Sequence, residues 1–97
     1  MEYFSKIEIA GVVKEVRRGF AEKTFCLIID TLEQSWHYGF SALFSDEAYE
    51  YWVGKIFTGD SIHLLADVVP LKIADTLMAT FIRVRTPDMV ISLSKEC

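Results

Sequence analysis

Residues that build disulfides, metal sites and phosphate-binding loops are scarce in this sequence. Of its two cysteines, Cys26 lies in an apolar run and Cys97 is the last residue, so we expect no structural disulfide. The two histidines, His37 and His63, have no Cys, Asp or Glu at metal-ligand spacing. The five glycines are too widely scattered to form a phosphate-binding loop. We therefore expect no metal, no cofactor and no enzyme activity.

Long hydrophobic runs are also absent. No stretch of about 18 apolar residues occurs, so we expect no transmembrane helix. Residues 1–10 contain no basic leader before an apolar stretch, so we expect no signal peptide and a cytoplasmic protein. No repeat, low-complexity run or linker divides the chain. With 52% hydrophobic residues, residues 1–97 are expected to form a single domain with its own core.

Positive charge is in deficit, because the net charge is −4. Residues 26–70 contain one basic and seven acidic side chains, which argues against a nucleic-acid partner. The basic residues gather instead near the two ends of the chain, as Lys14, Arg17, Arg18 and Lys23, and as Arg83 and Arg85. Either the fold brings these ends together into a positive groove, or the charges are simply scattered for solubility.

Alternating apolar residues predict two strands in the first third of the chain. Residues 6–18 alternate, with Gly11 in the apolar set, and a glycine inside a strand indicates a bulge, a bend or a close backbone approach. Residues 17–23 read as a turn in which Gly19 can take a positive φ. Residues 24–30 are nearly all apolar, which predicts a strand buried on both faces.

The middle of the chain predicts a loop over 31–35, a strand over 36–44 and one helix. Ser45 can cap the helix, and the acidic side chains of Asp46, Glu47 and Glu50 are most simply read as a solvated face. The apolar stripe of the helix consists of Ala48, Tyr49, Trp52, Val53 and Ile56. Gly54 falls inside this helix, and residues 58–60 end it.

Two further strands complete the pattern, over 61–69, where Pro70 stops the strand, and over 76–85. Residues 89–93 can add a short sixth strand at an edge. The fold is therefore predicted to be mainly β: a five-stranded OB-fold, which is a Greek-key barrel, with one α-helix between the third and fourth strands.

The ligand face of an OB-fold lies over its second and third strands and the adjoining loops. Candidate stacking rings are Trp36 and Tyr38 on the third strand and Phe20 in the first loop. A closed barrel needs one face of each strand for its core, so Trp36 either stacks on a ligand or packs inside, and a bulge at Gly39 would separate Trp36 from Phe40. The candidate phosphate contacts are Lys14, Arg17, Arg18, Lys23, Arg83 and Arg85, unless these side chains are merely solvated.

The stretch "WHYGFSALFSDEAYEYWVGKIFTGDSIHLLADVV" resembles the middle of bacterial-type single-stranded-DNA-binding proteins. The matching features are a Trp-His pair opening the third strand, a Phe ending it, a helix with an aromatic end, and a Gly-Asp turn. Residues 7–18 are similar to the opening strand of that family, so that the resemblance covers roughly residues 5–85. It implies that Trp36 stacks on bases and that the protein is a homo-oligomer, a dimer or tetramer.

The resemblance implies binding of single-stranded DNA, in support of DNA replication, recombination or repair. The chain departs from the family pattern in four places. The third strand is two residues longer between Trp36 and Phe44, and Asp67 stands where the family tends to have glycine. The hairpin between the fourth and fifth strands is reduced to residues 70–75, and no acidic tail follows. We therefore expect a compact, tail-less member. Two alternatives remain on the same fold, an adaptor that binds proteins and a protein that binds RNA.

Overall fold

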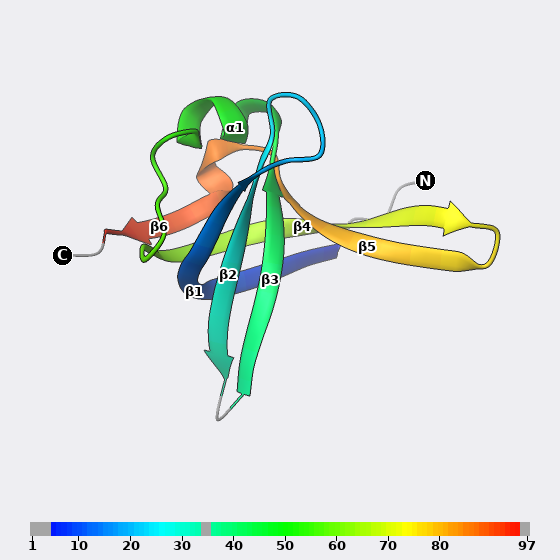
Figure 1. Cartoon of the computed structure of the whole chain (residues 1–97), viewed down its shortest axis with the longest axis horizontal. Coiled ribbons are helices and arrows are strands. Elements are labelled where there is room, and N and C mark those ends of the chain that lie inside the picture. Colours follow the sequence, from blue (N-terminus) through cyan, green and yellow to red (C-terminus); the bar gives the residue numbers. More distant parts are fainter. Residues whose placement is uncertain (1–4, 34–35, 96–97) are drawn as a thin grey trace.

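The computed structural model describes residues 5–33 and 36–95 (Figure 1). The elements run in the order β1 (Ser5–Arg18), β2 (Phe25–Glu33), β3 (Trp36–Phe44), α1 (Asp46–Trp52), β4 (Ser61–Ala74), β5 (Leu77–Val84), the 3₁₀ turn η1 (Pro87–Met89) and β6 (Val90–Ser94). The prediction of five strands, one helix between the third and fourth, and a short sixth strand is confirmed.

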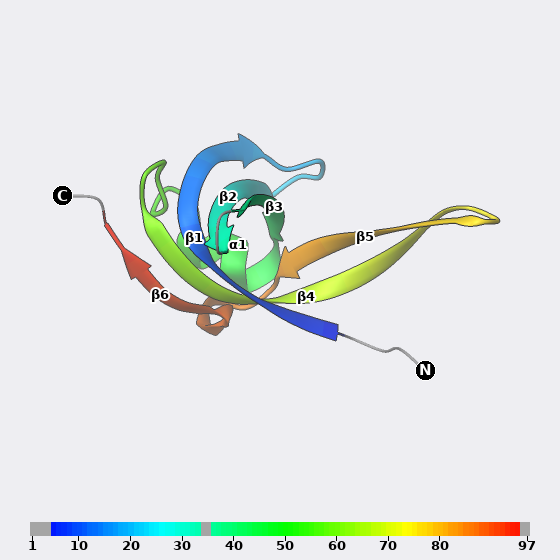
Figure 2. The same cartoon turned by 90° about the horizontal axis from the view of Figure 1, so that it is seen from below.

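The strands close into an OB-fold barrel, seen nearly end-on in Figure 2. Neighbouring strands follow the order β1-β2-β3-β5-β4, and a further antiparallel pairing of β1 with β4 completes the ring. The pairing of β3 with β5 is parallel and joins residues 42–44 to residues 82–84. Outside the ring, β6 pairs with the first residues of β4 and forms an edge, as expected for residues 89–93.

The long strand β1 bends because it belongs to two sheets. Residues 5–12 pair with β4, and residues 12–18 pair with β2. Gly11 lies at this changeover, where a Cβ atom would stand 2.4 Å from the carbonyl oxygen of Asp30. The predicted close backbone approach at this glycine is therefore confirmed. The register of β1 against β2 also shifts between Val13 and Glu15, which places a bulge at Lys14.

Strand β2 alternates in burial instead of being buried on both faces, so that prediction is wrong. Phe25, Leu27 and Ile29 face the core, whereas the residues between them are partly exposed. The reason is that the barrel covers only the inner face of this strand. The predicted loop over 31–35 is also too long, because β2 continues to Glu33, paired with β3.

The core lies inside the ring and is sealed at one end by α1. Phe44 is fully buried and stacks on Phe25, with the ring centroids 4.7 Å apart. Phe40 and Trp52 are both partly buried against the same cluster. The indole N–H of Trp52 also donates to the Pro87 carbonyl at 3.2 Å. Gly39 forms no bulge that would separate Trp36 from Phe40, because β2 and β3 keep one register throughout their pairing.

Helix α1 is shorter than predicted, because it ends at Trp52. Gly54 has a φ of +77° and lies beyond the helix, where it turns the chain back toward the barrel. Val53 is consequently exposed and not part of the apolar stripe, while Ile56 is buried from the following loop. Ser45 occupies the N-cap position, but its hydroxyl makes no capping hydrogen bond to the helix backbone.

The β4–β5 hairpin is long and projects from the barrel, which corrects the prediction of a reduced connection at residues 70–75 (Figure 1). Pro70 does not stop β4, which continues to Ala74 and pairs Pro70 with Thr80. Among the described residues, β1 accompanies β4 only as far as Val68, so Pro70 has a strand on one side only. A residue without an N–H is tolerated at such an open edge.

Candidate nucleic-acid interface

The loop between β1 and β2 presents one fully projecting ring. Two hydrogen bonds fix the backbone of this loop. The amide of Gly19 donates to the Thr24 carbonyl at 3.1 Å, and the Thr24 hydroxyl donates to the Ala21 carbonyl at 2.6 Å. Phe20 at the tip of this loop is 81% exposed. An aromatic ring held in water by an ordered loop is available for stacking.

The backbone strain in this loop lies at a residue other than the predicted one. Gly19 does not take a positive φ; it is needed for space, because a Cβ atom there would stand 2.0 Å from the Thr24 hydroxyl. Lys23 takes the left-handed conformation instead, with a φ of +54°. Non-glycine residues in this region are uncommon and concentrate at functional sites.

Phe20 does not stand alone, because Phe81 of β5 lies beside it. The two ring centroids are 6.3 Å apart and the ring planes meet at 89°, an edge-to-face arrangement. The pair thus joins the β1–β2 loop to the outer face of β5. Phe81 is not among the site residues predicted from the sequence, although its alternation with Arg83 places both residues on one face of the strand.

Two basic residues of the same loop carry positive charge into solvent. Arg18 ends β1 and Lys23 precedes β2, and both are exposed. Within residues 5–33 and 36–95, neither of them forms an ion pair or hydrogen bond through its side chain. They lie on either side of the exposed Phe20. Arg18, Phe20 and Lys23 also line one cleft of about 410 Å³.

Arg83 lies on the outer face of β5, next to Leu43 of β3 in the parallel pairing. Its side chain is 32% exposed, but the Nε atom is buried and has no hydrogen-bond partner among the described residues. The nearest carboxylate that pairs with it belongs to Asp46, 3.9 Å from one terminal nitrogen. Among the described residues the terminal nitrogens of this guanidinium make no hydrogen bond, so these donors remain for a phosphate.

The remaining predicted cations have partners in the free protein. Arg17 bonds Glu15 at 2.9 Å; that hydrogen bond lowers the pKa of the Glu15 carboxyl and raises the pKa of Arg17. Lys14 stands 4.0 Å from Asp30, and both of these side chains reach solvent. A phosphate role for Arg17 or Lys14 would compete with these contacts.

Arg85 has a different environment, because it binds a buried carboxylate. Asp67 is 1% exposed and receives Lys6 on one oxygen at 2.9 Å and Arg85 on the other at 2.8 Å. Burial alone raises the pKa of Asp67, but the hydrogen bonds and charges of Lys6 and Arg85 outweigh it, and the net pKa is lowered. In the free protein Arg85 therefore stabilises the barrel by neutralising Asp67.

The two rings predicted on β3 can be placed only by backbone register. Trp36 pairs with Glu33 and Tyr38 pairs with Thr31, near the tip of the β2–β3 hairpin. Their side chains lie outside the part of the chain that the structure describes, so their stacking roles stay predictions.

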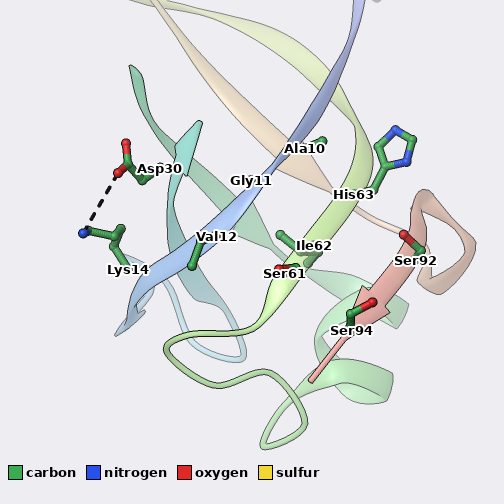
Figure 3. A pocket seen from close by; sticks show the side chains of 10 residues that line it. All are labelled: Ala10, Gly11, Val12, Lys14, Asp30, Ser61, Ile62, His63, Ser92 and Ser94. Atoms are coloured by element: carbon green, nitrogen blue, oxygen red, sulfur yellow. Dashed lines mark ion pairs between the residues drawn. The ribbon is translucent and has the colours of Figure 1, made fainter. Parts of the chain in front are cut away.

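A second concave surface lies across β1, β4 and β6 (Figure 3). This groove of about 670 Å³ is lined mainly by small or polar side chains, with the Lys14–Asp30 ion pair at one side. His63 projects from β4 at the other side, and its ring nitrogen contacts a carboxylate oxygen of Glu8 at 2.5 Å. None of the described residues lining this groove is Phe, Tyr or Trp. Stacking on bases therefore favours the face around Phe20.

Within residues 5–33 and 36–95, no three His, Cys, Asp or Glu side chains gather closely enough to hold a metal ion. No helix in this part of the chain has the length and hydrophobicity needed to cross a bilayer.

Comparisons with known proteins gave a structural match. No protein-family model and no curated protein matches the sequence. Among solved structures, the chain is similar to the mitochondrial single-stranded DNA binding protein Rim1 of S. cerevisiae. The TM-score is 0.63 at 14% sequence identity, over 84% of this chain and 90% of that chain. The resemblance noted in the sequence is thus confirmed at the level of the fold.

Proposed function

We propose that this protein binds single-stranded DNA without catalysis, across the face formed by the β1–β2 loop and β5. One observation carries the proposal: the exposed ring of Phe20, packed edge-to-face on the half-buried Phe81, is bordered by Arg18, Lys23 and the incompletely paired Arg83. The similarity of the fold to a single-stranded DNA binding protein supports it.

Each part of this face has a physical task in binding. A base stacked on the exposed ring of Phe20 contributes about 1–3 kcal/mol, and the contact tolerates any sequence because every base has a π-face. Phe81 supports Phe20 from the side and limits the motion of the loop. Arg18, Lys23 and Arg83 neutralise phosphates, which makes binding dependent on salt.

The wider biological role is part of the same proposal. A protein that coats single strands would act in DNA replication, recombination or repair, in the cytoplasm. The homo-oligomer implied by the resemblance would place several such faces along one strand. Sedimentation of the purified protein, free and with oligo-dT, measures the oligomeric state and the number of protomers per strand.

The test is fluorescence anisotropy of labelled oligo-dT titrated with protein at about 50 and 200 mM salt. We expect binding that weakens steeply with salt, and a loss of about tenfold in affinity for Phe20→Ala, within the range for one stacked base. Phe57→Ala is the matched control. Phe57 is also exposed, at 59%, but lies in the loop after α1, on the other side of the helix from the β1–β2 loop (Figure 1).

Three outcomes would decide against the proposal or modify it. Absence of binding at low salt by the folded protein would overturn it. Equal losses for Phe20→Ala and Phe57→Ala would mean that the face is placed wrongly. Tryptophan fluorescence of the wild type and of Trp36→Ala, each titrated with oligo-dT, then tests β3. Quenching that occurs in the wild type and is absent in the variant would mean that a base stacks on Trp36. Titration with oligo-U in the same assay separates an RNA-binding protein from a DNA-binding one.

The adaptor is the second candidate function, and one observation favours it. Apolar side chains are exposed away from the β1–β2 loop, namely Tyr51, Val53 and Phe57 around the end of α1 and Ile91 on the edge strand β6. Exposed apolar groups beside an open strand edge are suited to protein contacts. If oligo-dT and oligo-U both fail to bind, this reading replaces the first.

A further inference from the structure

Asp46 occupies an unusual position at the junction of β3 and α1. Its φ is +55°, and Asp46 and Lys23 are the only non-glycine residues with positive φ among the described residues. Both line the same cleft of about 320 Å³ between the β1–β2 loop and α1. The Ser45 hydroxyl donates to one carboxylate oxygen of Asp46 at 3.0 Å. The backbone and this hydrogen bond together hold the carboxylate where it stands, although 64% of the side chain is exposed.

The same carboxylate oxygen of Asp46 faces Arg83. The distance from the terminal nitrogen of Arg83 is 3.9 Å, which is within ion-pair range but too long for a hydrogen bond. Asp67, the register partner of Arg83 on β4, is bonded instead to Lys6 on one oxygen and to Arg85 on the other. Arg83 thus has an anion near it that does not use its donors.

A phosphate can use these donors better than Asp46 does. A guanidinium binds a phosphate through two parallel N–H···O bonds, and such charge-assisted bonds are about twice as strong as neutral ones. The Nε atom of Arg83 is buried, so the fork would form through the terminal nitrogens of this side chain, which is 32% exposed. A free strand passing from Phe20 along β5 would bring a phosphodiester to this position.

We propose that Arg83 is a phosphate subsite and that Asp46 lowers its affinity by competing with the phosphate of a single strand. The inference rests on the proposed function, and it adds an affinity-setting residue that the sequence analysis read as part of a solvated helix face. Glu22 and Glu50 line the same cleft as Asp46, but no ion pair joins either of them to Arg83 among the described residues. The competition is therefore specific to Asp46.

The test is a double-mutant cycle on oligo-dT affinity, with Asp46→Asn, Arg83→Gln and both together. Asn is the substitution of choice at position 46, because it removes the charge and tolerates the left-handed backbone. We expect Asp46→Asn to bind oligo-dT two- to fivefold more tightly, about the value of one partly exposed ion pair. Arg83→Gln should weaken binding by about tenfold and reduce the slope of log K against log salt by about 0.7.

The coupling between the two sites is the decisive quantity. In the Arg83→Gln background, Asp46→Asn should lose its gain and match the control Glu47→Gln, which removes one charge from the next, exposed residue of α1. Circular dichroism and thermal unfolding check that each variant is folded. Arg83→Lys, which keeps the charge but loses the fork, replaces Arg83→Gln if the latter does not fold.

The outcomes separate this inference from the function on which it rests. If the wild type does not bind oligo-dT, both fall together. If the wild type binds and Phe20→Ala weakens it, but Asp46→Asn gains no more than Glu47→Gln, the competition is refuted and the proposed function stands. The competition is also refuted if Asp46→Asn still tightens binding in the Arg83→Gln background. The gain would then come from the change in net charge and not from Arg83.

Discussion

Neutralising Asp67 should destabilise the barrel in a way that depends on pH. The buried carboxylate of Asp67 joins three strands, because Lys6 comes from β1 and Arg85 follows β5, while Asp67 itself lies on β4. In Asp67→Asn, the side chain keeps its size and loses its charge. Lys6 and Arg85 then lose their common partner, and the amide nitrogen of Asn cannot accept their hydrogen bonds.

The magnitude follows from the exposure of the three groups. A hydrogen bond to a charged group contributes about 1.5–3 kcal/mol, and stripping one partner from a fully buried pair costs about 3–5 kcal/mol. The side chains of Lys6 and Arg85 are 53% and 40% exposed, so water compensates part of the loss. We expect Asp67→Asn to lower the free energy of unfolding by about 2–3 kcal/mol at neutral pH, a large share of the roughly 5–15 kcal/mol of a typical domain.

The sign of the pH dependence follows from the lowered pKa of Asp67. Its pKa in the folded protein lies below the ordinary value of 3.8, because the contacts with Lys6 and Arg85 outweigh the effect of burial. The stabilisation is therefore complete above the unfolded-state pKa and is lost as the pH falls through the folded-state pKa. The wild type should lose its advantage over Asp67→Asn below about pH 4.

Urea unfolding followed by circular dichroism, from about pH 7 to about pH 3, measures this difference. Glu15→Gln is the control, because Glu15 bonds Arg17 at 2.9 Å but is exposed, and it should change stability far less. A difference between wild type and Asp67→Asn that does not shrink on acidification would refute the ion-pair argument. So would a difference at neutral pH no larger than that of Glu15→Gln.

The glycines make two further predictions that the same unfolding assay can check. Gly11→Ala should lower the free energy of unfolding by about 1–3 kcal/mol through overpacking, since the new Cβ would meet the Asp30 carbonyl oxygen at 2.4 Å. Gly39→Ala is the control: nothing lies within 4 Å of the new Cβ, so the free energy of unfolding should stay within about 0.5 kcal/mol of wild type. Gly54→Ala should cost about 1–2 kcal/mol although its site is open, because the φ of +77° disfavours any Cβ atom; an unchanged stability would mean that the turn relaxes to another conformation.

Local patterns in the sequence were sufficient to predict the elements of the fold. Alternating or continuous apolar residues identified the strands, and the acidic residues after Ser45 marked the start of the helix. The errors came where tertiary context decides. Among the described residues only β5 pairs beside Pro70, which allows the strand to continue through this proline, and α1 stops early because Gly54 takes a positive φ. Neither the one-sided pairing nor the sign of φ can be read from neighbouring residues.

The candidate site was harder to predict, because its contacts join distant parts of the chain. Phe20 was recognised as an exposed ring, yet its partner Phe81 follows much later in the sequence. The basic residues near the two ends looked equivalent, but Arg85 neutralises buried Asp67 while Arg83 keeps an unbonded donor. Which cation is available to a ligand depends on where the acids fold, and that is a property of the closed barrel.

The proposed binding face lies over the short parallel pairing of β3 with β5, which we expect to be the least stable strand pairing of the barrel. Only three residue pairs close the barrel there, and the chain reinforces them with bonds from the Ser45 and Ala48 amides to the Val84 and Arg85 carbonyls. Amides of this pairing should exchange with solvent sooner than those of the long antiparallel pairings. A DNA strand bound from Phe20 to Arg83 would bridge this pairing. Binding of the ligand would then also stabilise the closed barrel.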